Sequence, residues 1–205
     1  MVLASGNRGK LAEFTALLSP YGVNVEPLSR FAAHGPEETG ASFLENALLK
    51  ARAAASVAHV PAIADDSGLE VDALHGAPGI FSARFAGAEA DEDANNRKLI
   101  EALQGIAAAQ RSARFRCVLV YVRTPTDHAP IIAEGVWEGR ILESPQGDGG
   151  FGYDPLFLPR GLAVSAAEMS AEEKNRLSHR GQATGRLLQA LIVSGAIGAA
   201  TARSG

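Results

Sequence analysis

The spacing of apolar residues along the chain predicts a series of helices. Leu11, Phe14 and Leu18 recur at helical spacing, and Pro20 ends that segment. Capping boxes, in which a serine is followed three residues later by a glutamate, occur at residues 42–45 and 170–173 and are typical of helix starts. We therefore expect helices over residues 11–18, 42–60, 92–104 and 178–193.

Alternating and continuous apolar runs predict the strands. The clearest strand runs from Arg114 to Arg123, and both of its faces are apolar, which indicates a central strand covered on both sides. The turn-rich segment TPTDHAP joins it to a strand over residues 131–137 and is short enough for a hairpin. Shorter strands are expected over residues 2–4, 23–28 and 61–64. This mixture of alternation and hairpin predicts an α/β fold with a mixed sheet.

Length and composition agree with a globular protein. The chain has 205 residues, of which 46% are hydrophobic and 20% charged, so disordered and fibrous classes are excluded. No linker divides the sequence, and we expect one domain over residues 1–205, with two lobes that share a sheet. The net charge of −4 lacks the basic excess of a nucleic-acid binder, so no nucleic-acid partner is expected.

Cysteine content and hydropathy indicate the compartment. Cys117 is the only cysteine, which excludes an intrachain disulfide and favours a reducing environment. No targeting segment is recognisable after Met1, and the apolar stretch over residues 187–200 is too short and too interrupted to span a bilayer. We expect a cytoplasmic protein with no membrane contact.

The first polar segment with chemical potential lies between the first strand and the first helix. It consists of Ser5, Gly6, Asn7, Arg8, Gly9 and Lys10. Backbone N–H groups at a helix start suit an anion, and the lysine adds a positive charge. The segment is not a Walker A loop, because the glycine spacing differs and Leu11 follows the lysine. A simple strand-to-helix turn fits the same residues equally well.

Two acidic segments suggest a cation site. Asp65, Asp66, Ser67 and Gly68 directly follow the predicted strand over residues 61–64, and ligands of α/β sheets gather at such strand ends. Adjacent carboxylates in a crevice repel each other unless a cation lies between them, and Mg²⁺ suits carboxylate and phosphate oxygens. A solvated turn is the simpler alternative.

A loop carboxylate from the segment EETG (residues 37–40) could complete the oxygen shell of that cation. Lys50, on the helix that Ser42 caps, could then face a phosphate as a point charge. The alternative is an ordinary solvated loop and an exposed lysine.

The last segment is glycine-rich and aromatic. Its glycines match G-x-G-x-x-G, but Pro155 and an apolar run follow where a phosphate-binding helix should begin, so a dinucleotide site is rejected. Aromatic rings beside an aspartate, with His and Arg at a later helix start, could instead stack on a base and bind its edge. A rigid loop with its aromatics in the core is equally compatible. The residues concerned are Phe151, Gly152, Tyr153, Asp154, Lys174, His179 and Arg180.

Taken together, the chain resembles the inosine triphosphate pyrophosphatase family, which hydrolyses non-standard purine nucleoside triphosphates. The first strand, which starts almost at Met1, is shorter than usual and is the one departure. Seven strings in family order between residues 5 and 183 carry the resemblance: SGNRGK, EETG, SFLENALLKA, ADDSGLEVDAL, GAPGIFSAR, GGFGYDPLF and SHRGQA.

The resemblance implies an elongated two-lobed α/β fold, a long mixed sheet flanked by helices, an active site in the cleft and a homodimer. It implies Mg²⁺-dependent hydrolysis of ITP, dITP and XTP to the monophosphate and pyrophosphate. Glu38 and Asp66 would hold the metal, and Asp66 would also be the general base. Residues 5–10, Lys50 and Ser67 would bind the substrate, and Phe151 to Asp154, Lys174, His179 and Arg180 would form the base pocket.

The residues also allow two other functions. A related pyrophosphatase for modified pyrimidine or guanine nucleotides is one, although the pair His179 and Arg180 argues against it. A catalytically silent nucleotide-binding module is the other, but a simple binder has no need of the acidic residues. No Ser-His-Asp or Cys-His signature is recognisable, so we expect direct attack by water.

Overall fold

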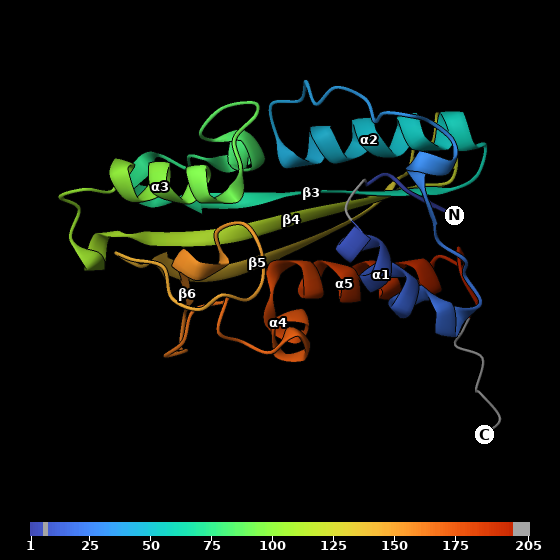
Figure 1. The fold of residues 1–205 in the computed structure, drawn as a ribbon. Coiled ribbons are helices and arrows are strands. Elements are labelled where there is room, and N and C mark those ends of the chain that lie inside the picture. Colours follow the sequence, from blue (N-terminus) through green and yellow to red (C-terminus); the bar gives the residue numbers. More distant parts are fainter. Residues whose placement is uncertain (6–7, 199–205) are drawn as a thin grey trace. The chain divides into compact units, whose positions relative to one another are not determined.

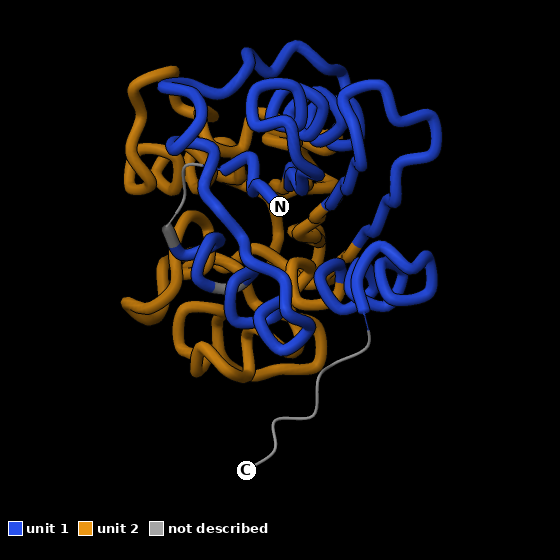
Figure 2. Tube along the Cα trace, turned by 90° about the vertical axis from the view of Figure 1, so that its right-hand side faces the viewer, with its two compact units in different colours: residues 1–66, 118–134, 183–205 blue, residues 67–117, 135–182 orange. Residues whose placement is uncertain are grey.

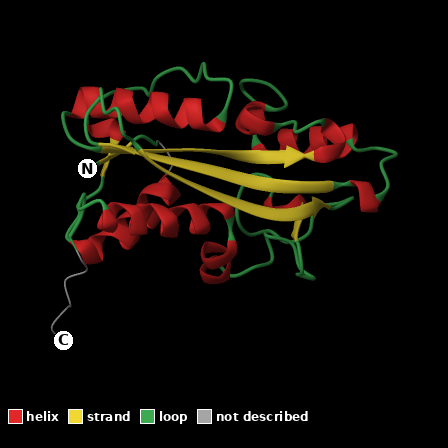
Figure 3. Cartoon of the chain, turned by 180° about the vertical axis from the view of Figure 1, so that it is seen from behind, coloured by secondary structure: helices red, strands yellow, loops and turns green. Residues whose placement is uncertain are grey.

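The computed structural model describes residues 1–5 and 8–198, which form an α/β fold with a mixed sheet (Figures 1 and 3). The strands are β1 (Val2–Leu3), β2 (Glu26–Pro27), β3 (Ala62–Val71), β4 (Ser112–Val122), β5 (Ile131–Ile141) and β6 (Phe157–Pro159). The α-helices are α1 (Arg8–Leu18), α2 (Phe43–Ala58), α3 (Glu92–Ala102), α4 (Ala171–Leu177) and α5 (His179–Val193). Within these residues the six-stranded sheet has the order β2-β1-β3-β4-β5-β6. The predicted fold class is confirmed.

The described chain divides into two compact units (Figure 2). Unit 1 comprises residues 1–66, 118–134 and 183–205, and unit 2 comprises residues 67–117 and 135–182. One of the points at which the chain passes between the units lies inside β3, between Asp66 and Ser67. The expectation of two lobes around a cleft stays a prediction.

Unit 1 is a parallel sheet segment between helices. β1 pairs in parallel with both β2 and β3, with Val2 opposite Glu26 and Ala62. Helix α2 covers one face of these strands, and α1 and α5 cover the other (Figures 1 and 3). The buried face of α2 is rich in alanine, which lets the helix pack closely on β1. Its buried alanines are Ala47, Ala51, Ala54 and Ala55.

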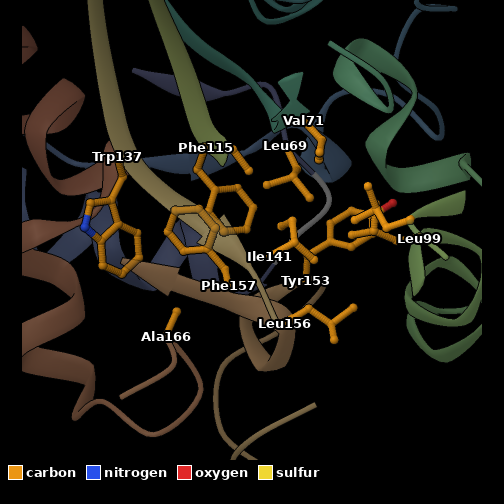
Figure 4. Close-up of a cluster of buried hydrophobic side chains, with 12 residues drawn as sticks. Leu69, Val71, Leu99, Phe115, Trp137, Ile141, Tyr153, Leu156, Phe157 and Ala166 are labelled. Carbon is orange, nitrogen blue, oxygen red and sulfur yellow. The ribbon is translucent and has the colours of Figure 1, made fainter. Parts of the chain in front are cut away.

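Unit 2 is built around an aromatic core (Figure 4). The ring of Phe157 lies 4.7 Å from that of Phe115 and 5.3 Å from that of Trp137, both in tilted geometry. Such tilted pairs are favourable beyond the area they bury. Tyr153 and Leu156, from the glycine-rich segment, extend this core towards Leu99 of α3. The core therefore anchors the segment that carries the candidate base-binding residues.

The structure corrects the predicted strand over residues 61–64. β3 continues to Val71, so the acidic pair Asp65 and Asp66 lies within a strand and not directly after one. The strand continues because Leu69 and Val71 are fully buried and give the sheet further apolar positions. β1, in contrast, ends at Leu3, where the chain turns into α1. The acidic pair therefore lies just beyond the end of the β1 pairing.

Other strands also differ from the predictions. β2 is only two residues long, and β5 extends to Ile141 past the predicted end at residue 137. β6 has three residues and was not predicted, because so short a strand leaves no periodic pattern. It pairs antiparallel with β5 through Gly139, where an added Cβ would lie 2.5 Å from the carbonyl oxygen of Leu158.

The predicted helices are confirmed in position and type. The side chains of Ser42 and Ser170 accept hydrogen bonds from the backbone N–H groups of Glu45 and Glu173, as expected for N-caps. The central strand is also confirmed, since every residue of β4 from Cys117 onwards is buried. Among the described residues, no helix combines the length and apolarity that a bilayer crossing requires.

Asp127 organises the connection between β4 and β5. Its Oδ2 accepts from the backbone N–H of Arg123 and its Oδ1 accepts from that of Ala129, both at 2.9 Å. These bonds hold the pKa of the Asp127 carboxyl below its ordinary value. The predicted hairpin is thus closed by one carboxylate that serves both sides of the turn.

We expect Asp127→Ala to lower the free energy of unfolding by about 1–2 kcal/mol at neutral pH, because two backbone donors lose a charged acceptor. A carboxyl whose pKa is lowered by folding stabilises the protein above its unfolded pKa, ordinarily 3.8, and loses that contribution as the pH falls through the folded value. The difference between parent and variant should therefore shrink below about pH 4. Urea unfolding from pH 7 to 3 measures it, and a pH-independent difference would contradict this.

Candidate active site

The candidate site in unit 1 begins with the two aspartates of β3. Successive side chains of a strand point to opposite faces, so Asp65 and Asp66 project in different directions. Lys10, in the first turn of α1, donates to both oxygens of Asp65, at 2.7 and 2.8 Å. Asp66 turns towards α2 instead, where Lys50 donates to its Oδ1 at 2.9 Å. In the structure each aspartate is thus paired with its own lysine, and a cation shared by the two carboxylates stays a prediction.

Lys50 joins Asp66 to the EETG loop. Its ammonium also donates to Oε1 of Glu38 at 2.7 Å, and its side chain is only 13% exposed. The lysine therefore lies between the two carboxylates that the resemblance assigns to a metal. It does not face solvent, as the simpler alternative for this residue required.

Asn46, which sequence reasoning missed, completes this cluster. It lies one turn before Lys50 on α2 and donates from Nδ2 to Oδ2 of Asp66 at 3.3 Å. Its Oδ1 accepts from the backbone N–H of Gly40 at 2.8 Å. The available signal was a polar residue on the apolar stripe of the helix, between Phe43 and Ala47. We call Lys10, Glu38, Asn46, Lys50, Asp65 and Asp66 the carboxylate–lysine cluster.

Burial and neighbouring charges both act on the pKa values of Asp66 and Lys50. Burial raises the pKa of Asp66, and Glu38 acts in the same direction, although Lys50 and Asn46 oppose them. Burial also acts to lower the pKa of Lys50, but Asp66 and Glu38 outweigh it, so the pKa of the ammonium is raised. A raised carboxyl pKa beside a charged lysine is typical of a group prepared to accept a proton or bind a cation.

A pocket of about 260 Å³ opens beside the cluster. Ser5, Lys10, Glu38, Lys50 and Asp65 are among its lining residues. No three His, Cys, Asp or Glu side chains among the described residues group closely enough to hold a metal by themselves. Two hard carboxylates fit Mg²⁺, which usually takes one or two protein carboxylates and fills its shell with water and substrate phosphates. The Lys50 ammonium between Glu38 and Asp66 indicates that the position accommodates a cation.

The candidate site in unit 2 gathers around Phe151. The Lys174 ammonium lies 4.4 Å and the Arg180 guanidinium 5.4 Å from the centre of its ring, within cation–π range. Phe151 is 44% exposed. An exposed aromatic face flanked by two cations can stack on a planar, electron-rich ligand.

Asp154 shapes the loop that presents Phe151. Its Oδ2 accepts from the backbone N–H of Phe151 at 2.7 Å and also pairs with Lys174. Gly150 has φ +74°, and an added Cβ there would overlap the Asp154 carboxylate at 2.2 Å. Asn96 of α3, a second residue that sequence reasoning missed, donates to the carbonyl of Gly152 at 2.9 Å. Contacts with Asp154, Lys174 and Asn96 therefore hold the loop in place.

The remaining predicted base-pocket residues have different surroundings. Arg180 donates to the hydroxyl of Ser67 at 3.2 Å. The ring of His179 stacks on Phe115, with centroids 4.8 Å apart, and is buried. The hydroxyl of Tyr153 donates to the carbonyl of Ser82 at 2.8 Å, and its ring lies in the aromatic core. Phe151 is therefore exposed enough to stack on a ligand, whereas the ring of Tyr153 is buried in the core.

The phosphate-binding prediction is described only in part. Gly6 and Asn7 lie outside the described residues, as does the side chain of Arg8. Ser5 and Lys10 line the pocket of unit 1, and α1 begins at Arg8, which places a helix N-terminus at this segment. The predicted residues thus form two groups, one in each unit, that meet in the sequence at the consecutive residues Asp66 and Ser67 of β3.

Comparison with known proteins identifies relatives along almost the whole chain. The profile of the Ham1 family matches residues 1–190. A dITP/XTP pyrophosphatase from Thioalkalivibrio sulfidiphilus is 56% identical over 191 residues, covering 93% of this chain and 97% of that protein. The dITP/XTP pyrophosphatase of Escherichia coli K12 is 50% identical over 191 residues, with coverage of 93% and 97%. The structure of a HAM1 protein from Coxiella burnetii matches with a TM-score of 0.89 and 46% identity, over 93% of this chain and 96% of that one.

We expect Lys50→Met to destabilise the metal-free protein by about 3 kcal/mol at neutral pH, since the buried Asp66 and the partly buried Glu38 lose their cation. Added Mg²⁺ should then raise the melting temperature of the variant more than that of the parent, because a divalent ion replaces the missing charge. Thermal unfolding with and without millimolar Mg²⁺ measures both effects. Lys98→Met, at an exposed lysine of α3, is the control, and equal Mg²⁺ shifts in all three proteins would contradict a cation site.

Proposed function

This chain belongs to the Ham1 family, and on that premise we propose that it hydrolyses dITP, XTP and ITP to the nucleoside monophosphate and pyrophosphate. Such an activity removes non-canonical purine nucleotides from the nucleotide pool. The observation that carries the proposal is Lys50 held between Glu38 and Asp66, beside a pocket that Ser5 and Lys10 also line. It combines a place for a cation with positive charge for phosphates.

The reaction needs charge neutralisation and a positioned water more than covalent chemistry. The bond between the α- and β-phosphates breaks, water supplies the new oxygen, and Asp66 takes the proton of that water. Burial raises the pKa of Asp66, which makes its carboxylate a stronger base. Glu38 and Asp66 would hold Mg²⁺, which would supply charge stabilisation for the leaving pyrophosphate.

Residues 5–10 and Lys50 are assigned to the triphosphate. The start of α1 at Arg8 supports an anion site, because the first N–H groups of a helix have no partner within the helix. Lys10 is held by Asp65, so its ammonium group is already in place when a phosphate arrives. Little side-chain entropy is then lost on binding.

The base is assigned to the group of Ser67, Phe151, Asp154, Lys174 and Arg180, with His179 behind it. Phe151 provides an exposed face for stacking, and Arg180 a donor for the oxygen at purine C6. Hypoxanthine and xanthine carry that oxygen, whereas adenine carries an amino donor, which leaves two donors facing each other. Sites built on such hydrogen bonds can reject the mismatched analogue by about 10⁴-fold.

Two further parts of the assignment stay predictions. The homodimer is implied by the resemblance alone, and the cytoplasmic location by the single cysteine and the lack of a recognisable targeting segment. A catalytically silent nucleotide-binding module is disfavoured, because a binder has no need to bury Asp66 beside Lys50.

Pyrophosphate release from a panel of nucleoside triphosphates tests the function. We expect ITP, dITP and XTP to be hydrolysed far faster than ATP, with a smaller margin over GTP, and every rate to require Mg²⁺. Zinc should substitute poorly, since the proposed ligands are all oxygens. Full activity in excess chelator would refute the metal assignment, and equal rates for ITP and ATP would refute the substrate assignment.

Asp66→Asn should reduce kcat by at least about 10²–10⁴-fold, because loss of a general base alone has that effect and loss of a metal contact adds to it. Nucleotide binding should persist, since Lys10 and the base-binding group are unchanged. Single-turnover assays give the rate and equilibrium binding of ITP gives the affinity. A variant with near-parental kcat would remove Asp66 from the mechanism.

Arg180→Ala should raise KM for ITP and narrow the preference for ITP over ATP, since the donor to the base edge is lost. The measurement is kcat/KM for ITP, GTP and ATP on both proteins. Arg176→Ala, at an exposed arginine of α4, is the matched control and should leave the ratios unchanged. An unchanged ITP:ATP ratio in Arg180→Ala would mean that Arg180 does not read the base.

A further inference from the structure

Asn46 stands out because it is a fully buried polar residue on the apolar face of α2. Its exposed fraction is 0%, and Phe43, Ala47 and Ala51 on the same helix are buried hydrophobic residues. A buried amide is costly unless its donor and acceptor are satisfied. The partners of Asn46 therefore indicate why a polar group is kept at this position.

The two ends of the Asn46 amide bind two different segments, the EETG loop and β3. Oδ1 accepts from the Gly40 N–H, and Nδ2 donates to Oδ2 of Asp66. The amide is directional, because only its nitrogen can donate to the carboxylate and only its oxygen can accept from the backbone. Neither leucine nor aspartate, which have a similar shape, satisfies both partners.

Asn46 and Lys50 together hold both oxygens of Asp66. They are one helical turn apart and so lie on the same face of α2. Lys50 donates to Oδ1 and Asn46 to Oδ2, which fixes the plane of the carboxylate as well as its position. A carboxylate held by the lysine alone would remain able to rotate about its last bond.

The same amide sets the position of the EETG loop. At Gly40, an added Cβ would lie 2.7 Å from Oδ1 of Asn46 and 2.7 Å from Cβ of Glu45, so the loop backbone approaches α2 as closely as glycine allows. Glu38 precedes this contact by two residues and reaches Lys50 from it. One side chain thus ties together the two segments that carry Glu38 and Asp66.

We propose that Asn46 is the positioning residue of the proposed reaction: it orients the Asp66 carboxylate and holds Glu38 at the distance at which both serve one cation. The inference rests on the proposed function and deepens it. Hydrogen-bond partners of metal-binding carboxylates typically contribute 10–100-fold in activity or metal affinity, which gives the expected size of the effect.

The first experiment compares Asn46→Leu with Asn95→Leu. Asn95 is a buried asparagine of α3 that also both accepts and donates: its amide accepts from the N–H of Ala86 at 2.7 Å and donates to the carbonyl of Ala83, rather than to a carboxylate, at 3.2 Å. Both variants should lose stability to a similar extent. Only Asn46→Leu should lower kcat for ITP, by about 10–100-fold, and raise the Mg²⁺ concentration for half-maximal rate.

Separate measurements of kcat and KM distinguish a positioning role from a general loss of structure. KM for ITP should change less than about threefold in Asn46→Leu, since uniform binding by Lys10 and the base-binding group is retained. Rates are expressed per folded molecule, from thermal unfolding under assay conditions. Equal kcat losses in Asn46→Leu and Asn95→Leu, or none in either, would overturn the proposal.

A second experiment does not depend on activity and covers the case in which Asn46→Leu fails to fold. Asn46→Asp places a second carboxylate against Asp66 and should lower the melting temperature of the metal-free protein. Adding Asp66→Asn reverses the pair, so that residue 66 donates and residue 46 accepts from both Gly40 and residue 66. The double variant should recover most of the loss, and no recovery would mean that the two side chains are not coupled.

Failure of this inference is distinguishable from failure of the proposed function. If the parent releases no pyrophosphate from any triphosphate of the panel, the proposed function fails, whatever the Asn46 variants do. If the parent is active and Asn46→Leu keeps parental kcat per folded molecule, the function stands and the positioning role is wrong.

Discussion

The structure around β3 depends on keeping buried carboxylates beside partly buried lysines. Asp65 is 2% exposed and Asp66 7% exposed, and burying a carboxylate is costly unless a cation is within hydrogen-bond distance. Strand geometry sends the two side chains to opposite faces, where α1 supplies Lys10 to one and α2 supplies Lys50 to the other. The packing of both helices on unit 1 therefore determines the electrostatics of the site, and the site in turn restricts how these helices can pack.

The same arrangement recurs in unit 2 with a different purpose. Asp154 is buried and paired with Lys174, but its other hydrogen bond holds the backbone of Phe151. Tyr153 anchors the loop in the aromatic core while Phe151, two residues earlier, stays partly exposed. A ligand-binding aromatic needs such support, because an exposed ring on an unsupported glycine-rich loop would lose too much conformational entropy on binding.

A lysine between two carboxylates also bears on how a divalent cation would be received. Lys50 neutralises Glu38 and Asp66 in the structure, so the protein can fold with these carboxylates buried before any metal arrives. A metal that binds the same oxygens relieves the lysine of that role and leaves its ammonium for a phosphate. The cation and the triphosphate would then favour each other's binding, as expected for a metal that binds with few protein ligands.

The helices, the central strand and the chemical type of the site could be predicted from the amino-acid sequence. Periodicity located α1, α2, α3 and α5, because an amphipathic helix needs its apolar residues at fixed spacing wherever it packs. Segment motifs identified Lys10, Glu38, Lys50, Asp66 and the Phe151 loop as chemically meaningful. These are local properties of the chain, which a single segment can reveal.

Which of those residues are hydrogen-bonded to one another depends on the tertiary structure. Asp65 with Lys10 and Asp66 with Lys50 are separated by 55 and 16 positions, and nothing in the spacing distinguishes them from the opposite pairing. The extent of β3, the role of Asn46 and the separate positions of Phe151 and Tyr153 depend likewise on which surfaces meet. Hydrogen bonds between distant segments form only where packing brings their atoms within about 3 Å, and packing is a property of the whole fold.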